Sequence, residues 1–150
     1  MSTMYVEVSE IIEARPEELY AVLSDYRVGH PAILPKPYFT GLTVEEGGQG
    51  TGTHIQVEMK VLGTERRYQF VISEPEPGRV LVETDATAGV TTTFTVEPFD
   101  GGNTSRVTIT TKTKAAPGFA GIMERLLNPP ISRRIYKKEL QNLADYVRRK

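Results

Sequence analysis

The chain has 150 residues, the usual size of one domain, and a net charge of −1 with 39% hydrophobic and 25% charged residues. These values are typical of a globular protein and argue against a nucleic-acid-binding surface built on overall positive charge. The absence of cysteine excludes disulfides and thiolate metal sites. No signal peptide and no apolar stretch long enough for a membrane helix stand out, so we expect a single cytoplasmic domain over residues 1–150 without a transmembrane segment.

The first 35 residues predict a strand followed by two short helices. Apolar and polar side chains alternate over residues 5–13, which is typical of a strand. Pro16, followed by two acidic residues, marks the start of a helix, which we expect to end at Asp25. Residues 29–31 interrupt the helical pattern, and residues 32–34 add one further turn.

The middle of the chain predicts six strands. Alternation of apolar and polar residues continues almost without a break, and short turns rich in glycine, proline or asparagine divide it. The expected strands are residues 38–46, 51–62, 65–74, 79–86, 89–97 and 104–114. Since the connections are short, consecutive strands should pair as an antiparallel meander.

The last segment, residues 118–149, predicts a helix that is interrupted and restarts. Pro129 and Pro130 break the pattern, and Asn128 is the expected cap of the second part. Over residues 131–149 the apolar side chains gather on one face of the helix. That face consists of Tyr136, Leu140, Leu143 and Val147, with Ile135, Ala144 and Tyr146 at its margins.

These elements predict an α+β fold, a curved seven-stranded antiparallel sheet wrapped around a long C-terminal helix. A flat sheet would leave its outer strands uncovered by a single helix, so the sheet must curl. One helix does not fill the space inside such a curl. A cavity between the sheet and the helix is the expected result.

The order of elements and four motifs resemble the START/SRPBCC superfamily, and in particular the bacterial polyketide cyclase/dehydrase and lipid transport proteins. The resemblance covers nearly the whole chain. The motifs are the end of the first strand with the short helix (residues 13–26), His30-Pro31, the central hairpin (residues 74–81) and the final helix (residues 134–143). The resemblance implies a helix-grip fold with a deep pocket. It leaves the function open, because members include lipid carriers, receptors, aromatase/cyclases and antitoxin-like proteins.

A turn at Gly63-Thr64 predicts the register of the central hairpin and the side chains that share a face. The expected pairs are Val61–Arg66, Met59–Tyr68, Val57–Phe70 and Ile55–Ile72. Because the row is mostly apolar, we expect it to face the helix, either as plain core or as a pocket wall. In the aromatase/cyclases, the resemblance implies an inward arginine on the strand matching residues 65–74. Here Arg66 lies at the hairpin end, near the rim.

Several polar residues have both a structural and a functional interpretation. His30 either caps a turn before Pro31 or acts at the pocket mouth, and no second titratable group stands beside it in the sequence. His54 should point outward. Glu139 falls within the apolar face of the helix, where a carboxylate is costly unless it is paired. It either forms a salt bridge at the sheet edge or enters the pocket as an acceptor.

The predicted ligand-binding residues combine the inner rows of the sheet with the helix face. They are His30, Val57, Met59, Arg66, Tyr68, Phe70, Thr92, Phe94, Ile109, Thr111, Tyr136 and Leu140. We predict no catalytic residues, no metal site and no cofactor, since no catalytic motif or phosphate-binding loop is present. The basic residues between 133 and 150 are interpreted as the solvated back of the helix, with a membrane or nucleic-acid contact as the alternative.

Three functions follow as hypotheses. The first is a carrier or sensor that binds a lipid-like or polyketide-like small molecule. The second is an enzyme of the cyclase/dehydrase type, in which Tyr68, Tyr136 and either His30 or Arg66 position and protonate the ligand. The third is a protein-interaction module that uses the edge strand or the basic helix. The expected partner is a hydrophobic small molecule rather than a nucleic acid, and the sequence leaves monomer and homodimer open.

Overall fold

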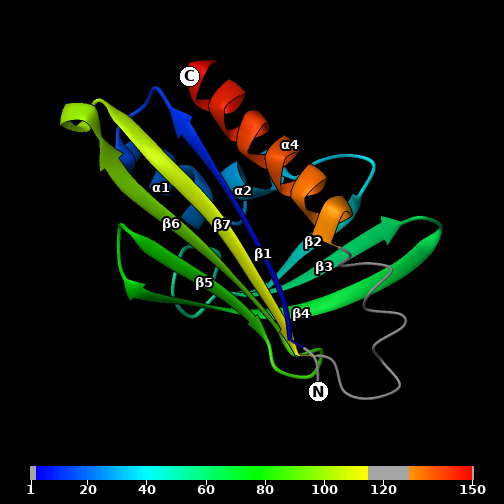
Figure 1. Cartoon of the computed structure of the whole chain (residues 1–150). Coiled ribbons are helices and arrows are strands. Elements are labelled where there is room, and N and C mark those ends of the chain that lie inside the picture. The colour runs from blue at the N-terminus through cyan, green and yellow to red at the C-terminus, as the bar shows by residue number, and fades with distance from the viewer. Residues whose placement is uncertain (1–2, 115–128, 150) are drawn as a thin grey trace.

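The computed structural model describes residues 3–114 and 129–149. In these residues a seven-stranded antiparallel sheet curves around one long helix, as predicted (Figure 1). Two short helices pack on the same side of the sheet and contact the long one. The predicted break before the long helix and its cap at Asn128 lie outside the described residues.

The elements follow the predicted order closely. They are β1 (Thr3–Ile12), α1 (Pro16–Ser24), α2 (Gly29–Ile33), β2 (Phe39–Glu46), β3 (His54–Val61), β4 (Thr64–Glu76), β5 (Val80–Asp85), β6 (Val90–Phe99), the 3-10 turn η1 (Asp100–Gly102), β7 (Thr104–Lys114) and α4 (Pro129–Arg148). The spatial order of strands is β1-β7-β6-β5-β4-β3-β2. The first strand therefore pairs with the last, and β1 and β2 form the two edges.

The second short helix differs from the prediction, since α2 includes the residues expected to interrupt it. Pro31 is tolerated because it lies in the first turn of α2, where a backbone N–H has no partner within the helix. The Asp25 carboxylate accepts hydrogen bonds from the backbone N–H groups of Val28 and Gly29 at 3.2 and 3.3 Å. These bonds satisfy the free end of α2 and start the helix earlier than its sequence pattern indicates.

The predicted register of the β3–β4 hairpin is wrong by two residues. Val57 pairs with Tyr68 and Ile55 with Phe70, where the prediction had Phe70 and Ile72. The turn is formed by Leu62 and Gly63, both with positive φ, which is the conformation that a two-residue hairpin turn requires. Because the error is an even number of residues, every side chain stays on its predicted face.

The core lies between the concave face of the sheet and the apolar face of α4. Ile135, Tyr136, Leu140 and Leu143 are buried there, and Ile135, expected at the margin of this face, is buried like the others. Opposite them, alternate residues of every strand from β3 to β7 point inward. The C-terminal half of α4 packs along β1, and the Asn142 side chain donates a hydrogen bond to the Ile33 carbonyl of α2 at 3.0 Å.

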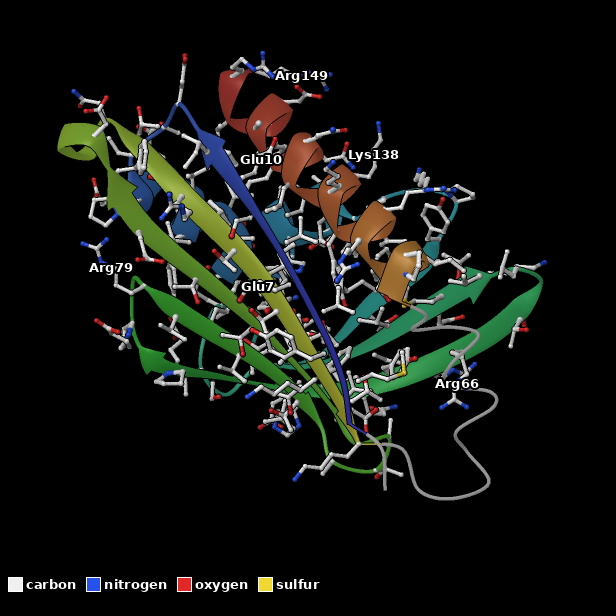
Figure 2. All side chains as sticks on the ribbon, viewed as in Figure 1. Glu7, Glu10, Arg66, Arg79, Lys138 and Arg149 are labelled. Carbon is white, nitrogen blue, oxygen red and sulfur yellow. The ribbon has the colours of Figure 1, made fainter. Side chains whose placement is uncertain are left out.

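A few large apolar side chains are exposed on the outer surface of the described residues. The most exposed large apolar side chains are spread over separate segments, namely Tyr5, Ile11, Val28, Leu62, Val71 and Phe99. Arg133, Arg134, Lys137 and Lys138 are exposed, and Lys138 lies on the side of α4 away from the sheet (Figure 2). None of the helices in residues 3–114 and 129–149 is long and apolar enough to cross a membrane.

Candidate functional site

A cavity lies between the N-terminal half of α4 and the inner face of strands β2 to β6. Its volume is about 50 Å³, and it is partly open to solvent. The walls are mainly apolar, and the polar groups gather at α2, β5 and α4. The lining residues are His30, Leu34, Phe39, Leu42, Ile55, Val57, Met59, Tyr68, Phe70, Glu83, Val90, Thr92, Phe94, Ser132, Ile135, Tyr136 and Glu139.

Most of the sequence-predicted ligand-binding residues meet at this cavity. His30, Val57, Met59, Tyr68, Phe70, Thr92, Phe94 and Tyr136 all line it. Ile109, Thr111 and Leu140 are buried behind the wall and do not line it. Tyr68 and Phe70 stack with their ring centroids 5.6 Å apart, so the aromatic part of the wall is packed while space remains in front of it.

Arg66 lies outside the cavity wall. It is half-buried on β4 opposite Met59, and its guanidinium carbon lies 5.8 Å from the centre of the Tyr68 ring. Figure 2 shows it on the β3–β4 side of the molecule, below the N-terminal end of α4. The structure therefore places Arg66 close to the end of the β3–β4 hairpin and not among the residues that line the cavity.

Three hydroxyl groups predicted to face a ligand bond to one another. The Thr92 and Thr111 hydroxyls lie 2.9 Å apart, and the Tyr136 hydroxyl lies 2.5 Å from that of Thr111. Burial raises the pKa of Tyr136, so its phenol stays protonated. This chain joins β6, β7 and α4, and it fixes the helix against the sheet at the cavity.

His30 is held in one orientation by its backbone neighbours and by aromatic rings. Its Nδ1 lies 2.7 Å from the Leu23 carbonyl oxygen, and since a carbonyl only accepts, Nδ1 carries a hydrogen. The Tyr26 ring stacks on the imidazole at 4.5 Å, and Phe94 meets it edge-on at 5.3 Å. The remaining nitrogen, Nε2, is thereby directed at two carboxyl groups.

The expectation that no titratable group accompanies His30 is wrong. Its Nε2 lies 3.5 Å from Glu83 Oε2 on β5 and 4.0 Å from Glu139 Oε2 on α4. The Tyr26 hydroxyl donates a hydrogen bond to Glu83 Oε2 at 2.7 Å. Burial raises the pKa of Glu83, while His30 and the Tyr26 hydrogen bond oppose that rise. Three elements distant in sequence thus place one imidazole and two carboxyl groups together.

Glu139 is the most unusual member of this group. It is 2% exposed and lines the cavity, so it does not form the salt bridge at the sheet edge that the sequence left open. Burial raises the pKa of Glu139 well above its ordinary value, and the neighbouring Glu83 raises it further. The raised pKa favours the neutral carboxylic acid form of this side chain, which is able to donate a hydrogen bond.

Glu83 is the functional candidate that the sequence interpretation missed. A signal was present, because Leu81 and Glu83 are two residues apart on one strand and so share a face. A buried leucine therefore predicts a buried glutamate. His54, in contrast, points outward as predicted, with 45% of its side chain exposed.

Within the described parts of the chain, no group of three His, Cys, Asp or Glu side chains is arranged to hold a metal ion. The arrangement at the cavity can do two things chemically. It can bind an apolar molecule by burial, and it can donate or accept protons at the end formed by His30, Glu83 and Glu139.

Comparison with known proteins gives a family and a set of similar structures. A family model described as polyketide cyclase/dehydrase and lipid transport matches residues 3–148. A comparison with curated proteins found no match. The solution structure of the KanY protein (ms6282) is similar with a TM-score of 0.83 and 29% identity, over 99% of both chains.

Two further structures share the fold at lower identity. The Zhui aromatase/cyclase from Streptomyces sp. R1128 has a TM-score of 0.74 and 18% identity, over 99% of this chain and 95% of that one. A START superfamily protein from Mycobacterium smegmatis has a TM-score of 0.67 and 11% identity, over 97% of both chains. At this identity the likeness concerns the fold, and function has to be argued from the site.

Proposed function

Because the chain belongs to the polyketide cyclase/dehydrase and lipid transport family, we propose that it binds an apolar small molecule in the cavity between the sheet and α4, as a carrier or sensor. One observation carries the proposal. The cavity has apolar walls and a few converging polar groups at one end, which is the composition of small-molecule sites in general. The apolar part supplies affinity through burial, and the polar end supplies orientation.

The size of the cavity sets a condition on the ligand. About 50 Å³ is well below the roughly 300–1,000 Å³ of typical ligand pockets. Phe39, Leu42 and Met59 line the cavity and are only half-buried. Binding a drug-sized molecule requires these partly exposed side chains of β2 and β3 to move outward.

A pair of substitutions on one strand tests the site. Leu42→Trp fills the cavity from β2, and Thr43→Trp places the same side chain on the outer face one residue further along. We expect butylbenzene, titrated against methyl resonances of the protein, to bind Leu42→Trp roughly tenfold more weakly or worse, because overfilling costs about 1–3 kcal/mol. Thr43→Trp should bind like the unmodified protein. Equal affinity in both variants would place the ligand elsewhere.

Native mass spectrometry of protein purified gently from its own host tests whether the protein carries a small molecule there. We expect a retained small molecule that dissociates on unfolding and is absent from Leu42→Trp. Recovery of protein of bare chain mass alone would contradict a carrier role.

A second candidate function, an enzyme acting on an enolisable ligand, is favoured by the convergence of His30, Glu83 and Glu139. Nε2 of His30 would take a proton from a carbon next to a carbonyl group, while the Glu139 carboxyl donates to the carbonyl oxygen. The C–H electron pair becomes the double bond of an enol. In deuterated water, the reverse step returns a deuteron to that carbon.

Deuterium exchange into 4-phenyl-2-butanone measures this step directly. We expect exchange faster than in buffer, lost in His30→Asn, whose amide keeps the bond to the Leu23 carbonyl but lacks the second ring nitrogen. His54→Asn, which changes the outward histidine, is the matched control. A protein that binds the ketone and exchanges no faster than buffer would be a carrier only.

A further inference from the structure

Among the described residues that line the cavity, two buried polar atoms have no hydrogen-bond partner, the Tyr68 hydroxyl oxygen on β4 and Glu139 Oε2 on α4, and the second lies beside His30. Among residues 3–114 and 129–149, no donor or acceptor lies within hydrogen-bond distance of Glu139 Oε2, although this atom is fully buried. The His30 Nε2 atom lies 4.0 Å away, too far for a hydrogen bond. A buried polar group left without a partner costs about 1–3 kcal/mol. Such an atom at the wall of a cavity indicates a position where a bound ligand supplies the missing hydrogen bond.

The surroundings of this carboxyl group decide what kind of guest fits. Burial and the nearby Glu83 raise the pKa of Glu139, which favours the protonated carboxyl, the form that offers a hydrogen. On the other side, the Glu83 Oε2 atom already accepts the Tyr26 hydroxyl at 2.7 Å. The group that is missing at this end of the cavity is therefore a hydrogen-bond acceptor for Glu139.

Four classes of ligand head can be compared at this position. A carboxylate would lose its hydration and be repelled by Glu83, and an ammonium group would lose its hydration between apolar walls, each at a cost of several kcal/mol. A hydrocarbon would leave Oε2 as it is. A neutral carbonyl oxygen accepts the hydrogen and brings no charge into the cavity.

We propose that Glu139 determines ligand specificity, by donating a hydrogen bond to the carbonyl oxygen of an uncharged, otherwise apolar ligand. The inference rests on the proposed binding function and narrows it to ketones, aldehydes, esters and similar molecules. It assigns free fatty acids and amines to the molecules that the site rejects.

Four related probes test the assignment: butylbenzene, 4-phenyl-2-butanone, 4-phenylbutanoate and 4-phenylbutylammonium. Each is titrated at neutral pH against the methyl resonances of the protein, of Glu139→Met and of Glu139→Gln. We expect the unmodified protein to bind the ketone roughly fivefold more tightly than butylbenzene, as one net hydrogen bond gives. The two charged probes should bind more weakly than butylbenzene.

The two variants separate the hydrogen bond from the shape of the site. Met has nearly the length of Glu and no donor, so Glu139→Met should bind butylbenzene and lose the preference for the ketone. The amide of Glu139→Gln still donates a hydrogen, so this variant should keep the preference, and it reports on the inference even where Glu139→Met does not fold.

The outcomes distinguish the two proposals. If butylbenzene binds and the ketone binds no better, or if a charged probe binds best, the assignment of Glu139 is wrong while the binding function stands. Loss of the ketone preference in Glu139→Gln would also overturn it. If none of the four probes binds the unmodified protein, the binding function is wrong, and the role of Glu139 fails with it.

Discussion

At the scale of single residues, the sequence predicts the face on which a polar cavity residue lies better than it predicts which residues meet there. Glu139 could be placed in the apolar face of α4 from helical periodicity alone. Its neighbours could not, because Glu83 lies on a strand and His30 in a short helix, and their contact depends on how the sheet curls. Periodicity gives the face on which a residue lies. It does not give the residue opposite.

The raised pKa of Glu139 predicts a pH dependence of stability. Below its ordinary pKa of 4.5, the carboxyl is protonated in both the folded and the unfolded chain. Above that value the unfolded chain loses the proton and the folded chain keeps it, so the free energy of unfolding falls as pH rises, until the folded pKa is reached. Glu83 and His30 face the same carboxyl, with His30 Nε2 3.5 Å from Glu83 Oε2 and 4.0 Å from Glu139 Oε2, and both residues are retained in a variant at position 139.

Glu139→Gln removes this dependence. As pH rises above the ordinary pKa of 4.5, we expect the unmodified protein to lose stability relative to the variant, by up to about 1.4 kcal/mol per pH unit. Urea unfolding followed by circular dichroism at each pH measures the difference. Parallel pH profiles for the two proteins would show that position 139 is not the group responsible.

The two hydrogen bonds from tyrosine to glutamate provide a matched comparison of burial. Tyr26 donates to the fully buried Glu83, and Tyr20 donates at 2.6 Å to Glu74, where water has access. Tyr26→Phe leaves a buried carboxyl short of a partner, and we expect a loss of about 2 kcal/mol. Tyr20→Phe should lose less, since water replaces the missing hydroxyl. Urea unfolding measures both, and equal losses would contradict the difference in environment.

At the scale of elements, the sequence predicts most of the helices and strands. It predicts less well where a helix begins and how two neighbouring strands align. The seven strands, the first helix and the apolar face of α4 follow from alternation and helical periodicity. The register of the β3–β4 hairpin does not follow from these patterns, because Gly63 is compatible with a turn at residues 62–63 or at 63–64. The structure has the turn at residues 62–63, with Leu62 at φ 52°. The start of α2 does not follow from these patterns either, since it depends on hydrogen bonds to the Asp25 carboxylate.

The N-terminal half of α4 lines the cavity, whereas Leu143 in its C-terminal half packs in the core. Substitutions in the two halves should therefore affect ligand binding and stability differently. Leu143 is fully buried and lies outside the cavity wall, whereas Ile135 and Glu139 line it. We expect Leu143→Ala to cost about 2–4 kcal/mol of stability by leaving a void, and to leave butylbenzene binding intact while the protein is folded. Gln141→Ala, on the exposed side, should change stability by less than about 0.5 kcal/mol. Similar losses for both would mean that this part of α4 is not packed as described.

At the scale of the whole molecule, the open sheet is completed by a pairing of distant segments. Consecutive strands from β2 to β7 form hairpins, whereas β1 pairs with β7, with Ile12 opposite Ser105 and Thr3 opposite Lys114. Local hairpins form at a lower entropic cost than contacts between distant segments. The β6–β7 hairpin should therefore form before β1 joins it.

Folding kinetics can test this order with two buried valines, Val8 on β1 and Val96 on β6. We expect Val96→Ala to slow folding, because its contacts are already made in the transition state. Val8→Ala should mainly speed unfolding, since β1 docks later. Stopped-flow folding and unfolding in urea gives both rates. If Val8→Ala slows folding more than Val96→Ala does, β1 belongs to the nucleus.

The same pairing has a consequence for the chain during its synthesis. Strand β1 is synthesised before the other six strands of the sheet, but its partner residues begin at Ser105, 93 positions after Ile12. At roughly 5–20 residues per second, about 5–20 seconds pass before they exist. Throughout that interval Val6, Val8 and Ile12 have no sheet to join. Of the seven strands, β1 is thus the one whose neighbour is synthesised the longest time after it, and its apolar side chains lack their native contacts until then.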